Sequence, residues 1–240
     1  MISLKEVDEK REINLKNCPW RIVLSRKVSK YLTWGFVHTP ISANQITGLL
    51  FLISLVSVIL FSTGRYWNSL FAIFLFHVAF FLDQSDGEVA RFKKQTSLKG
   101  TYFDLMNHIT INPLILIGIG AGAYLTNPTQ IPSYIFLIGG FTGGYGLILN
   151  NFAKVKKYET YVNKNETQKL NNFYNEIKMD EKPKKSFIKE EIKNFFKPSI
   201  FDAIFIFGIL NILPYLVLIT GVIMPLQSLK RFYIESKRID

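Results

Sequence analysis

The sequence contains a single cysteine, Cys18, which excludes an intramolecular disulfide framework and a metal site built from several thiolates. The first forty residues lack a long apolar run, so we expect no cleavable signal peptide and an insertion that starts from an internal span. Acidic residues are scarce, with 18 against 29 basic ones. The net charge of +11 would suit a nucleic-acid-binding protein, and the positions of the basic residues decide whether that interpretation holds.

Long apolar runs, in contrast, are abundant. Hydrophobic residues make up 48% of the 240 residues, and phenylalanine alone contributes 21. Several runs approach the roughly 17–25 residues that a helix needs to cross a bilayer, which argues against a soluble fold. We therefore expect an all-α fold, a polytopic membrane helical bundle of about six transmembrane helices with an N-terminal amphipathic interfacial helix. The expected spans cover about 45–62, 67–82, 102–125 and 133–152, followed by two short spans within 195–232.

The segment after Pro19 has the pattern of an amphipathic helix. Its apolar residues recur at helical spacing while its basic residues occupy other faces, which is typical of a helix that lies on an anionic leaflet. An ordinary soluble amphipathic helix is the alternative. We expect residues 1–38 to form a cytosolic leader and this interfacial helix. Residues 39–240 would form the transmembrane domain, with a cytosolic loop at 153–198.

Prolines and glycines modify the expected spans. Pro113 predicts a kink or a local opening in the third span. Asn211 and Pro214 favour a tight turn that divides the last apolar stretch, and a single tilted helix is the alternative. The fourth span carries glycines that allow close helix packing, namely Gly139, Gly140, Gly143, Gly144 and Gly146.

The basic residues collect on one side of the expected topology. Of the 29 Lys and Arg residues, eight precede Pro40, four lie between the second and third spans, twelve lie in residues 153–198 and four follow Leu229. Arg65 alone is left for the opposite side. Under the positive-inside rule, both termini and the linker between the second and third spans face the cytoplasm. Membrane orientation thus explains the charge, and we expect no nucleic-acid partner.

Carboxylates interrupt the otherwise apolar segments at two places, on either side of the basic linker. An ionisable group costs about 2.5–3.5 kcal/mol at the bilayer centre, so its presence at a membrane segment suggests a function. The residues of each place recur at helical spacing and share one helix face. The first set comprises Asp83, Asp86, Gly87 and Ala90, and the second comprises Gly100, Asp104 and His108.

The two faces, brought together, would place three carboxylates and one imidazole around a common point. Hard oxygen ligands in that number suit Mg²⁺ or Mn²⁺, which bind through a few carboxylates and substrate phosphates. The small residues let a bulky ligand approach the backbone, and Arg91 can bind a phosphate with two parallel hydrogen bonds. The two sets therefore predict a site for a metal ion and a diphosphate.

At these residues the sequence resembles the CDP-alcohol phosphotransferase (CDP-alcohol phosphatidyltransferase) family, whose signature is D-x2-D-G-x2-A-R-x8-G-x3-D-x3-D. Seven positions match in type and spacing, from Asp83 to Asp104. The last position departs, because His108 stands where the family usually has its fourth aspartate. Family members often carry a Pro-Asn-x-x-Thr element at a helix start, and this chain keeps Asn44 and Thr47 of it. We expect Asn44 to support the site.

The resemblance implies a role for each matching residue. The metal-binding aspartates would be Asp83, Asp86 and Asp104. The residues that hold the cytidine nucleotide would be Gly87, Ala90, Arg91 and Gly100. The fourth aspartate is the general base of the family, and an imidazole at His108 suits the same work because its ordinary pKa lies near 6.5. A metal ligand, a hydrogen-bonding spacer and a relic in an inactive homologue are the alternatives for His108.

The predicted activity is the transfer of a substituted phosphate group from a CDP-alcohol to an acceptor alcohol, with release of CMP, in phospholipid biosynthesis. CDP-diacylglycerol is one candidate donor, and membrane lipid would surround the protein. The resemblance also implies a homodimer. A cluster just past the fourth span would hold an acceptor phosphate or serve as a positive-inside anchor, and it comprises Lys154, Lys156 and Lys157.

Other classes of membrane protein are open at this stage. A polyprenyl-diphosphate-using transferase also needs aspartate-rich helices and Mg²⁺, although its D-x3-D pattern lacks the G-x2-A-R continuation. A transporter or channel would carry its acids near the bilayer midplane rather than at one edge. A catalytically altered or silent homologue is the remaining alternative, and the histidine at position 108 is what makes it credible.

Overall fold

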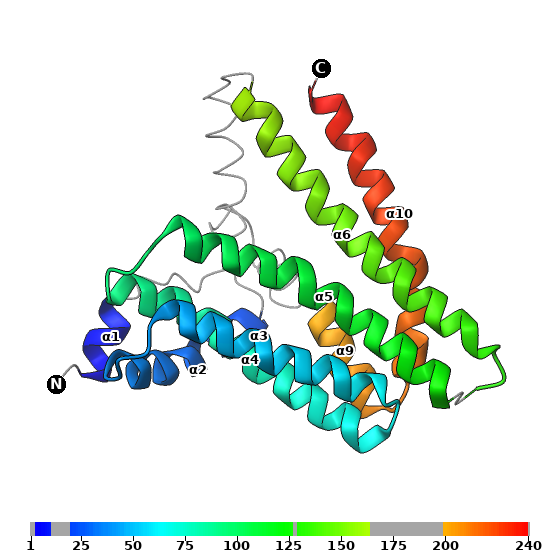
Figure 1. The fold of residues 1–240 in the computed structure, drawn as a ribbon, viewed down its shortest axis with the longest axis horizontal. Coiled ribbons are helices and arrows are strands. Elements are labelled where there is room, and N and C mark those ends of the chain that lie inside the picture. The colour runs from blue at the N-terminus through cyan, green and yellow to red at the C-terminus, as the bar shows by residue number, and fades with distance from the viewer. Residues whose placement is uncertain (1–2, 11–19, 127–128, 164–198, 240) are drawn as a thin grey trace, which may run out of the picture. The chain divides into compact units, whose positions relative to one another are not determined.

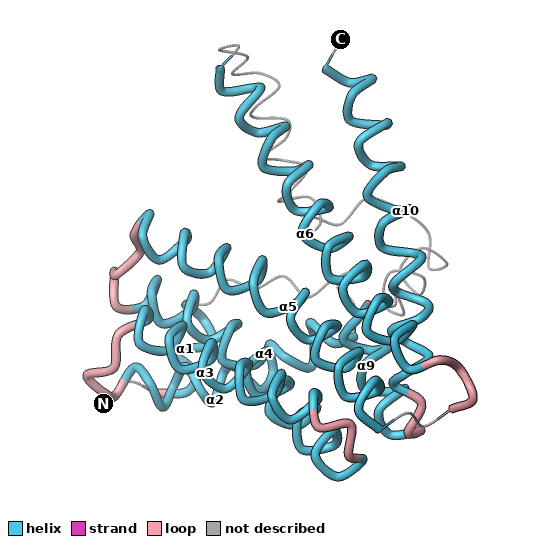
Figure 2. The backbone as a smooth tube through the Cα atoms, turned by 45° about the vertical axis from the view of Figure 1, so that its right-hand side comes forward, coloured by secondary structure: helices cyan, strands magenta, loops and turns pink. Residues whose placement is uncertain are grey.

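The computed structural model describes residues 3–10, 20–126, 129–163 and 199–239, and every element in these ranges is an α-helix (Figures 1 and 2). For residues 153–163, the backbone but not the side chains is described. The expectation of an all-α fold is confirmed. The helices are α1 (Leu4–Lys10), α2 (Trp20–Val37), α3 (Ala43–Ser62), α4 (Tyr66–Phe92), α5 (Leu98–Thr126), α6 (Ser133–Asn163), α9 (Ile200–Ile209) and α10 (Leu213–Ile239).

The described helices fit a polytopic membrane protein. Five of them, α3, α4, α5, α6 and α10, contain stretches long and apolar enough to cross a membrane. The last apolar stretch is divided at the expected turn, because α9 ends at Ile209 and α10 begins at Leu213, but only α10 is long enough for a span and α9 has 10 residues. Asn211 adopts a left-handed conformation with φ of 57°, and the amide of Ile212 donates back to the carbonyl of Phe207. Helix α9 is therefore a short apolar helix of 10 residues, and the alternative of a single tilted helix is wrong.

The start of α3 is fixed by a reciprocal cap. The backbone amide of Gln45 donates to the Ser42 hydroxyl at 3.3 Å, and the amide of Ser42 donates to the Gln45 side-chain oxygen at 2.8 Å. This capping box satisfies two amides that the first turn of a helix leaves without partners. The expected helix start in residues 39–47 is thus confirmed, with Ser42 as the capping residue.

Two helices run further than the sequence analysis expected. The second and third spans were expected to cover about 67–82 and 102–125, but α4 continues to Phe92 and α5 begins at Leu98. Lys94 ends α4 in a left-handed conformation with φ of 56°, and the amide of Gln95 donates to the carbonyl of Ala90. This C-terminal motif normally uses glycine, so the sequence offered no signal for it.

The second extension concerns the expected cytosolic loop at 153–198. Helix α6 continues to Asn163, so the first part of that segment is helical, and residues 164–198 lie outside the described range. Pro113 lies inside α5, which stays helical on both sides of it. Of the two alternatives, the local opening is wrong, because the residues that flank Pro113 are helical, and the kink stays a prediction.

The chain forms two compact units, which are described separately. The first unit includes residues 1–54 and 74–107, and its apolar core joins α3 to α4. The buried residues of this core are Ile46, Leu50, Ala79, Leu82 and Val89. Leu32 and Phe36 of α2 pack against the same cluster, so α2, α3 and α4 share one core. The division into a leader up to residue 38 and a transmembrane domain from residue 39 stays a prediction.

The second unit includes residues 55–73, 108–178 and 200–240. In it α6 and α10 run side by side, as both views of the backbone show (Figures 1 and 2). Glycine permits this approach, because a Cβ atom on Gly146 would lie 2.6 Å from the backbone of Met224 on α10. A Cβ atom on Gly140 would lie 2.8 Å from the carbonyl oxygen of Leu116 on α5. The expectation that the α6 glycines serve close packing is confirmed at these positions.

Candidate active site

A cavity of about 250 Å³ lies in the first unit where the ends of three helices meet. Helix α4 contributes Asp86, Gly87, Ala90 and Arg91, and helix α5 contributes Gly100, Thr101 and Asp104. Helix α3 contributes the three residues of its first turns, Ala43, Asn44 and Thr47. The linker between α4 and α5 closes the lining with Gln95, Thr96 and Ser97. Six of the eight residues singled out from the sequence therefore surround one cavity.

The other two predicted residues lie next to Asp104. Asp83 and Asp104 each offer a carboxylate oxygen, and these oxygens lie within 4.8 Å of each other. His108 follows Asp104 by one turn of α5, and one of its ring nitrogens lies within the same distance of the Asp104 carboxylate. Asp104 is thus common to both pairs, and a group of two carboxylates and an imidazole can bind a divalent ion.

The Asp86 carboxylate is held from α3. The hydroxyl of Thr47 donates to Asp86 Oδ2 at 2.7 Å, and both side chains are buried. This hydrogen bond fixes the orientation of a carboxylate that lines the cavity. From the sequence, Thr47 was noted only as part of a helix start, and no role in the site was predicted for it. Its hydroxyl, one turn after Ala43, orients a predicted metal ligand.

Asn44 and Gly100 are neighbours in the lining of the cavity. A Cβ atom added to Gly100 would lie 3.2 Å from Asn44 Oδ1, which is tighter than an ordinary contact. Glycine at this position therefore keeps the wall of the cavity open beside the amide of Asn44. Ser97 caps α5 here, because its hydroxyl accepts the backbone amide of Gly100 at 3.1 Å. The supporting role expected for Asn44 stays a prediction, and the amide lines the cavity as that role requires.

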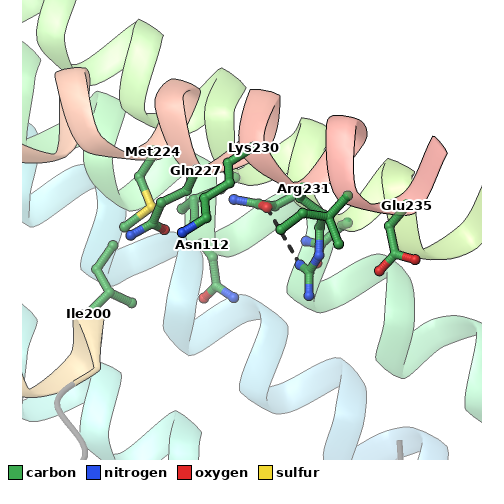
Figure 3. A pocket seen from close by; sticks show the side chains of 11 residues that line it. Asn112, Ile200, Met224, Gln227, Lys230, Arg231 and Glu235 are labelled. Carbon is green, nitrogen blue, oxygen red and sulfur yellow. Dashed lines mark hydrogen bonds between the residues drawn. The ribbon is translucent and has the colours of Figure 1, made fainter. Parts of the chain in front are cut away.

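A second cavity, of about 620 Å³, lies wholly within the second unit (Figure 3). Its lining is polar and carries amides, two cations and a carboxylate. The polar residues are Asn112, Asn150, Asn151, Gln227, Lys230, Arg231 and Glu235. The Arg231 guanidinium donates to the Asn150 side-chain oxygen at 3.5 Å, which ties α10 to α6 across the cavity. Such a lining can bind an anionic ligand that also carries hydroxyl groups.

Three lysines were expected near an acceptor phosphate. Lys154, Lys156 and Lys157 belong to the last part of α6, and their side chains lie outside the described residues. The cations that line the second cavity are instead Lys230 and Arg231 of α10. The sequence analysis counted these two residues only toward the orientation of the protein.

By its fold and its site, the chain is an integral multi-pass membrane protein in which carboxylates from two long helices line one polar cavity. The family model of CDP-alcohol phosphatidyltransferases matches residues 41–174, more than half of the chain. The chain therefore belongs to the CDP-alcohol phosphatidyltransferase family, a family of transferases that act on CDP-alcohols and use divalent metal ions. The matched segment contains every motif residue from Asp83 to His108. No curated protein matches the chain.

Proposed function

We propose that the protein is a membrane transferase that moves a substituted phosphate group from a CDP-alcohol to an acceptor alcohol and releases CMP in phospholipid biosynthesis. The observation that carries this proposal is the cavity of the first unit, whose lining combines two of the motif aspartates with the small motif residues. A soluble nucleotide headgroup needs a polar site of this kind at the edge of a membrane domain. CDP-diacylglycerol is the donor that we would test first.

The residues present suit a divalent ion such as Mg²⁺ or Mn²⁺. Asp83, Asp86 and Asp104 would hold it, since all three are hard oxygen donors and two of their oxygens already lie within 4.8 Å of each other. When bound, the ion would supply Lewis-acid stabilisation of the negative charge that develops on the leaving phosphate. The nucleotide would be held by Gly87, Ala90, Arg91 and Gly100.

The proposed reaction has one bond-forming and one bond-breaking event. The acceptor hydroxyl attacks the β-phosphorus of the CDP-alcohol, and the bond from that phosphorus to the oxygen bridging the two phosphates breaks. The electron pair of this bond leaves with CMP. His108 would accept the proton of the acceptor hydroxyl, because it stands one turn after Asp104 on α5. Arg91 would bind the diphosphate as a bidentate donor.

The acceptor is proposed to carry an anionic group together with hydroxyl groups. The support is the cavity of the second unit, where Lys230 and Arg231 suit a phosphate and the amides suit hydroxyls. Asn112, in the same lining, follows His108 by one turn of α5. An acceptor that fills this cavity would therefore approach along the helix that carries the proposed base.

The decisive experiment is an assay of CMP release by the purified protein. CDP-diacylglycerol and soluble CDP-alcohols are each offered with Mg²⁺ or Mn²⁺ against matched acceptors that differ only in a phosphate group. We expect metal-dependent CMP release, faster with the phosphorylated acceptor of a pair. The absence of both CMP release and metal-dependent CDP binding would reject the transferase and favour a silent homologue. A polyprenyl-diphosphate-using transferase would show neither signal with CDP compounds.

The orientation is proposed from the charge distribution, with both termini and the cavity of the first unit at the cytoplasmic side, and it requires the short apolar helix α9 to cross the membrane in addition to the five long spans. Single cysteines in a Cys18→Ser background test it, with Ser236→Cys near the C-terminus and Asn211→Cys in the turn between α9 and α10. A membrane-impermeant maleimide added to intact cells should label position 211 and leave position 236 unlabelled. Labelling of position 236 from outside would invert the proposed topology. A homodimer is likewise proposed, on the family resemblance.

A further inference from the structure

Helix α2 buries a stripe of polar residues and exposes several apolar ones, which is unusual for a surface helix. Ser25, Ser29 and Thr33 recur every four residues on one face and are all at most 1% exposed. Leu24 and Tyr31 of the same helix are 47% and 63% exposed. A buried stripe of hydroxyls needs a polar partner, because a buried polar group without a hydrogen bond is costly.

The partner of this stripe is Glu88 on α4. The hydroxyl of Thr33 donates to Glu88 Oε2 at 2.7 Å, and the hydroxyl of Ser29 donates to Oε1 at 3.1 Å. The Arg26 guanidinium donates to the same Oε1 at 2.8 Å and forms an ion pair with the carboxylate. The Glu88 side chain is 1% exposed and that of Arg26 is 20% exposed. Three successive turns of α2 thus converge on one buried carboxylate.

Glu88 occupies a position that the family signature leaves open, directly after Gly87 of the motif. At about 100° per residue, it points about 200° away from Asp86 and Ala90, which line the cavity. The carboxylate therefore fixes the rear of the helical turn whose front faces the proposed nucleotide. The fully buried hydroxyl of Ser85, also in this turn, donates to the carbonyl of Phe81 in its own helix at 3.0 Å and lies 3.5 Å from the carbonyl oxygen of Ser29 on α2. Ser85 thus packs against α2 in the same turn.

A second attachment lies at the C-terminal end of α4. The Lys93 ammonium donates to the backbone carbonyls of Thr39 and Ile41, at 2.6 Å and 2.8 Å. These carbonyls belong to the segment that joins α2 to α3. The motif turn of α4 is therefore held between two attachments to the N-terminal part of the chain, one at Glu88 and one at Lys93.

We propose that Glu88 is a positioning residue for the transfer reaction, which anchors the motif turn of α4 to α2 and so sets the place of Asp86, Gly87 and Ala90 in the cavity. This inference rests on the proposed function, since it concerns how that site is held. By this inference, the polar face of α2 contributes to binding of the CDP-alcohol donor, because it holds Glu88. The carboxylate acts through the helix and does not touch the substrate.

A positioning role and a purely structural role differ in the kinetic constants they affect. A variant that merely contains less folded protein shows a lower maximal rate with an unchanged KM, because the remaining molecules bind normally. A displaced motif turn instead weakens donor binding in every molecule. A misplacement of about 1 Å can cost on the order of 10²-fold, so we expect the KM for the CDP-alcohol to rise about tenfold or more. The KM for the acceptor should not change.

The test replaces the buried pair by apolar residues of similar size, in the double variant Arg26→Met/Glu88→Leu. Removing both partners leaves no uncompensated buried charge, and such replacements often keep or raise stability. The freed hydroxyls of Ser29 and Thr33 can donate to carbonyls of their own helix. The matched control is Asp8→Leu/Lys30→Met, which removes the exposed ion pair of 2.7 Å between α1 and the same α2. Glu88→Gln keeps the shape of the side chain and should fall between wild type and the double variant.

Unfolding temperature, metal-dependent CDP binding and the two KM values are measured for each protein. The inference predicts a folded double variant with an unchanged unfolding temperature and a raised KM for the donor alone, beside a control that matches wild type. An unaltered donor KM in the double variant would overturn it, whatever the maximal rate. Should the double variant fail to fold, the donor KM of Glu88→Gln decides by the same criterion. If wild type itself neither releases CMP nor binds CDP, the proposed function fails, and the inference is rejected with it.

Discussion

Replacing Asp104 by asparagine is expected to abolish CMP release while leaving the protein folded. Asp104 lines the cavity of the first unit, and its carboxylate lies within 4.8 Å of ligand atoms of both Asp83 and His108. An amide keeps the size of the side chain but loses the charge that a divalent ion requires. A general base alone contributes about 10²–10⁴-fold, so loss of the metal should lower the rate at least as much. The measurement is CMP release together with Mg²⁺-dependent CDP binding.

Asp83→Asn and Asp86→Asn should show the same combined loss if the three carboxylates share an ion. Asp202→Asn is the matched control, because it removes a carboxylate from the first turn of α9 that does not belong to the motif. This control should release CMP at the wild-type rate. Metal-dependent CDP binding that survives unchanged in all three motif variants would contradict a shared metal site.

The arrangement of the motif was predictable because it depends on helical periodicity. Asp86 and Gly87 precede Ala90 by about one turn on α4, and Gly100 precedes Asp104 by about one turn on α5. Local spacing places each set on one helix face, and a charged face in a membrane domain is costly unless it lines a polar cavity or pairs with another polar group. The structure brings these residues to one cavity, as the spacing indicated. Their roles in binding stay predictions.

The C-terminal ends of α4 and α6 were not predicted, and for α4 the reason is physical. Helix α4 stops at a left-handed lysine, Lys94, where glycine or asparagine is the usual signal. The break at Asn211 was predicted correctly because asparagine tolerates that conformation and Pro214 follows it. The second span was expected to end at about residue 82, where its apolar run ends, whereas α4 continues to Phe92.

The contacts across the chain were the largest omission from the sequence analysis. Glu88 and Thr33 are separated by 55 residues, and nothing local in the sequence pairs a glutamate on α4 with hydroxyls on α2. A signal was nevertheless present, since Ser25, Ser29 and Thr33 repeat every four residues and a polar stripe of small side chains suits a buried polar partner. The interpretation of α2 as an interfacial helix rested on its apolar and basic residues, and no partner was predicted for the stripe of hydroxyls.

Replacing His108 by alanine is expected to abolish most turnover and to retain metal-dependent CDP binding. The imidazole stands one turn after Asp104, in the place of the family's fourth aspartate, and a proton acceptor contributes about 10²–10⁴-fold to such a reaction. Binding should survive, because neither the aspartates nor the small motif residues are changed. His108→Asp should restore measurable activity, since it returns the carboxylate of the family signature. Rates and CDP affinities of the three proteins are measured side by side.

The matched control is His38→Ala, which removes an exposed histidine just after α2, whose Nδ1 lies 2.7 Å from the carbonyl oxygen of Trp34 and whose ring contacts the Trp34 ring. These contacts are with α2 and not with the motif, so turnover should stay at the wild-type rate. The pattern also separates the roles open to His108, because a metal ligand would lose CDP binding together with turnover, whereas a base loses turnover alone. A His108→Ala variant that turns over at the wild-type rate would make the histidine a spacer, and the proton would then pass to another acceptor.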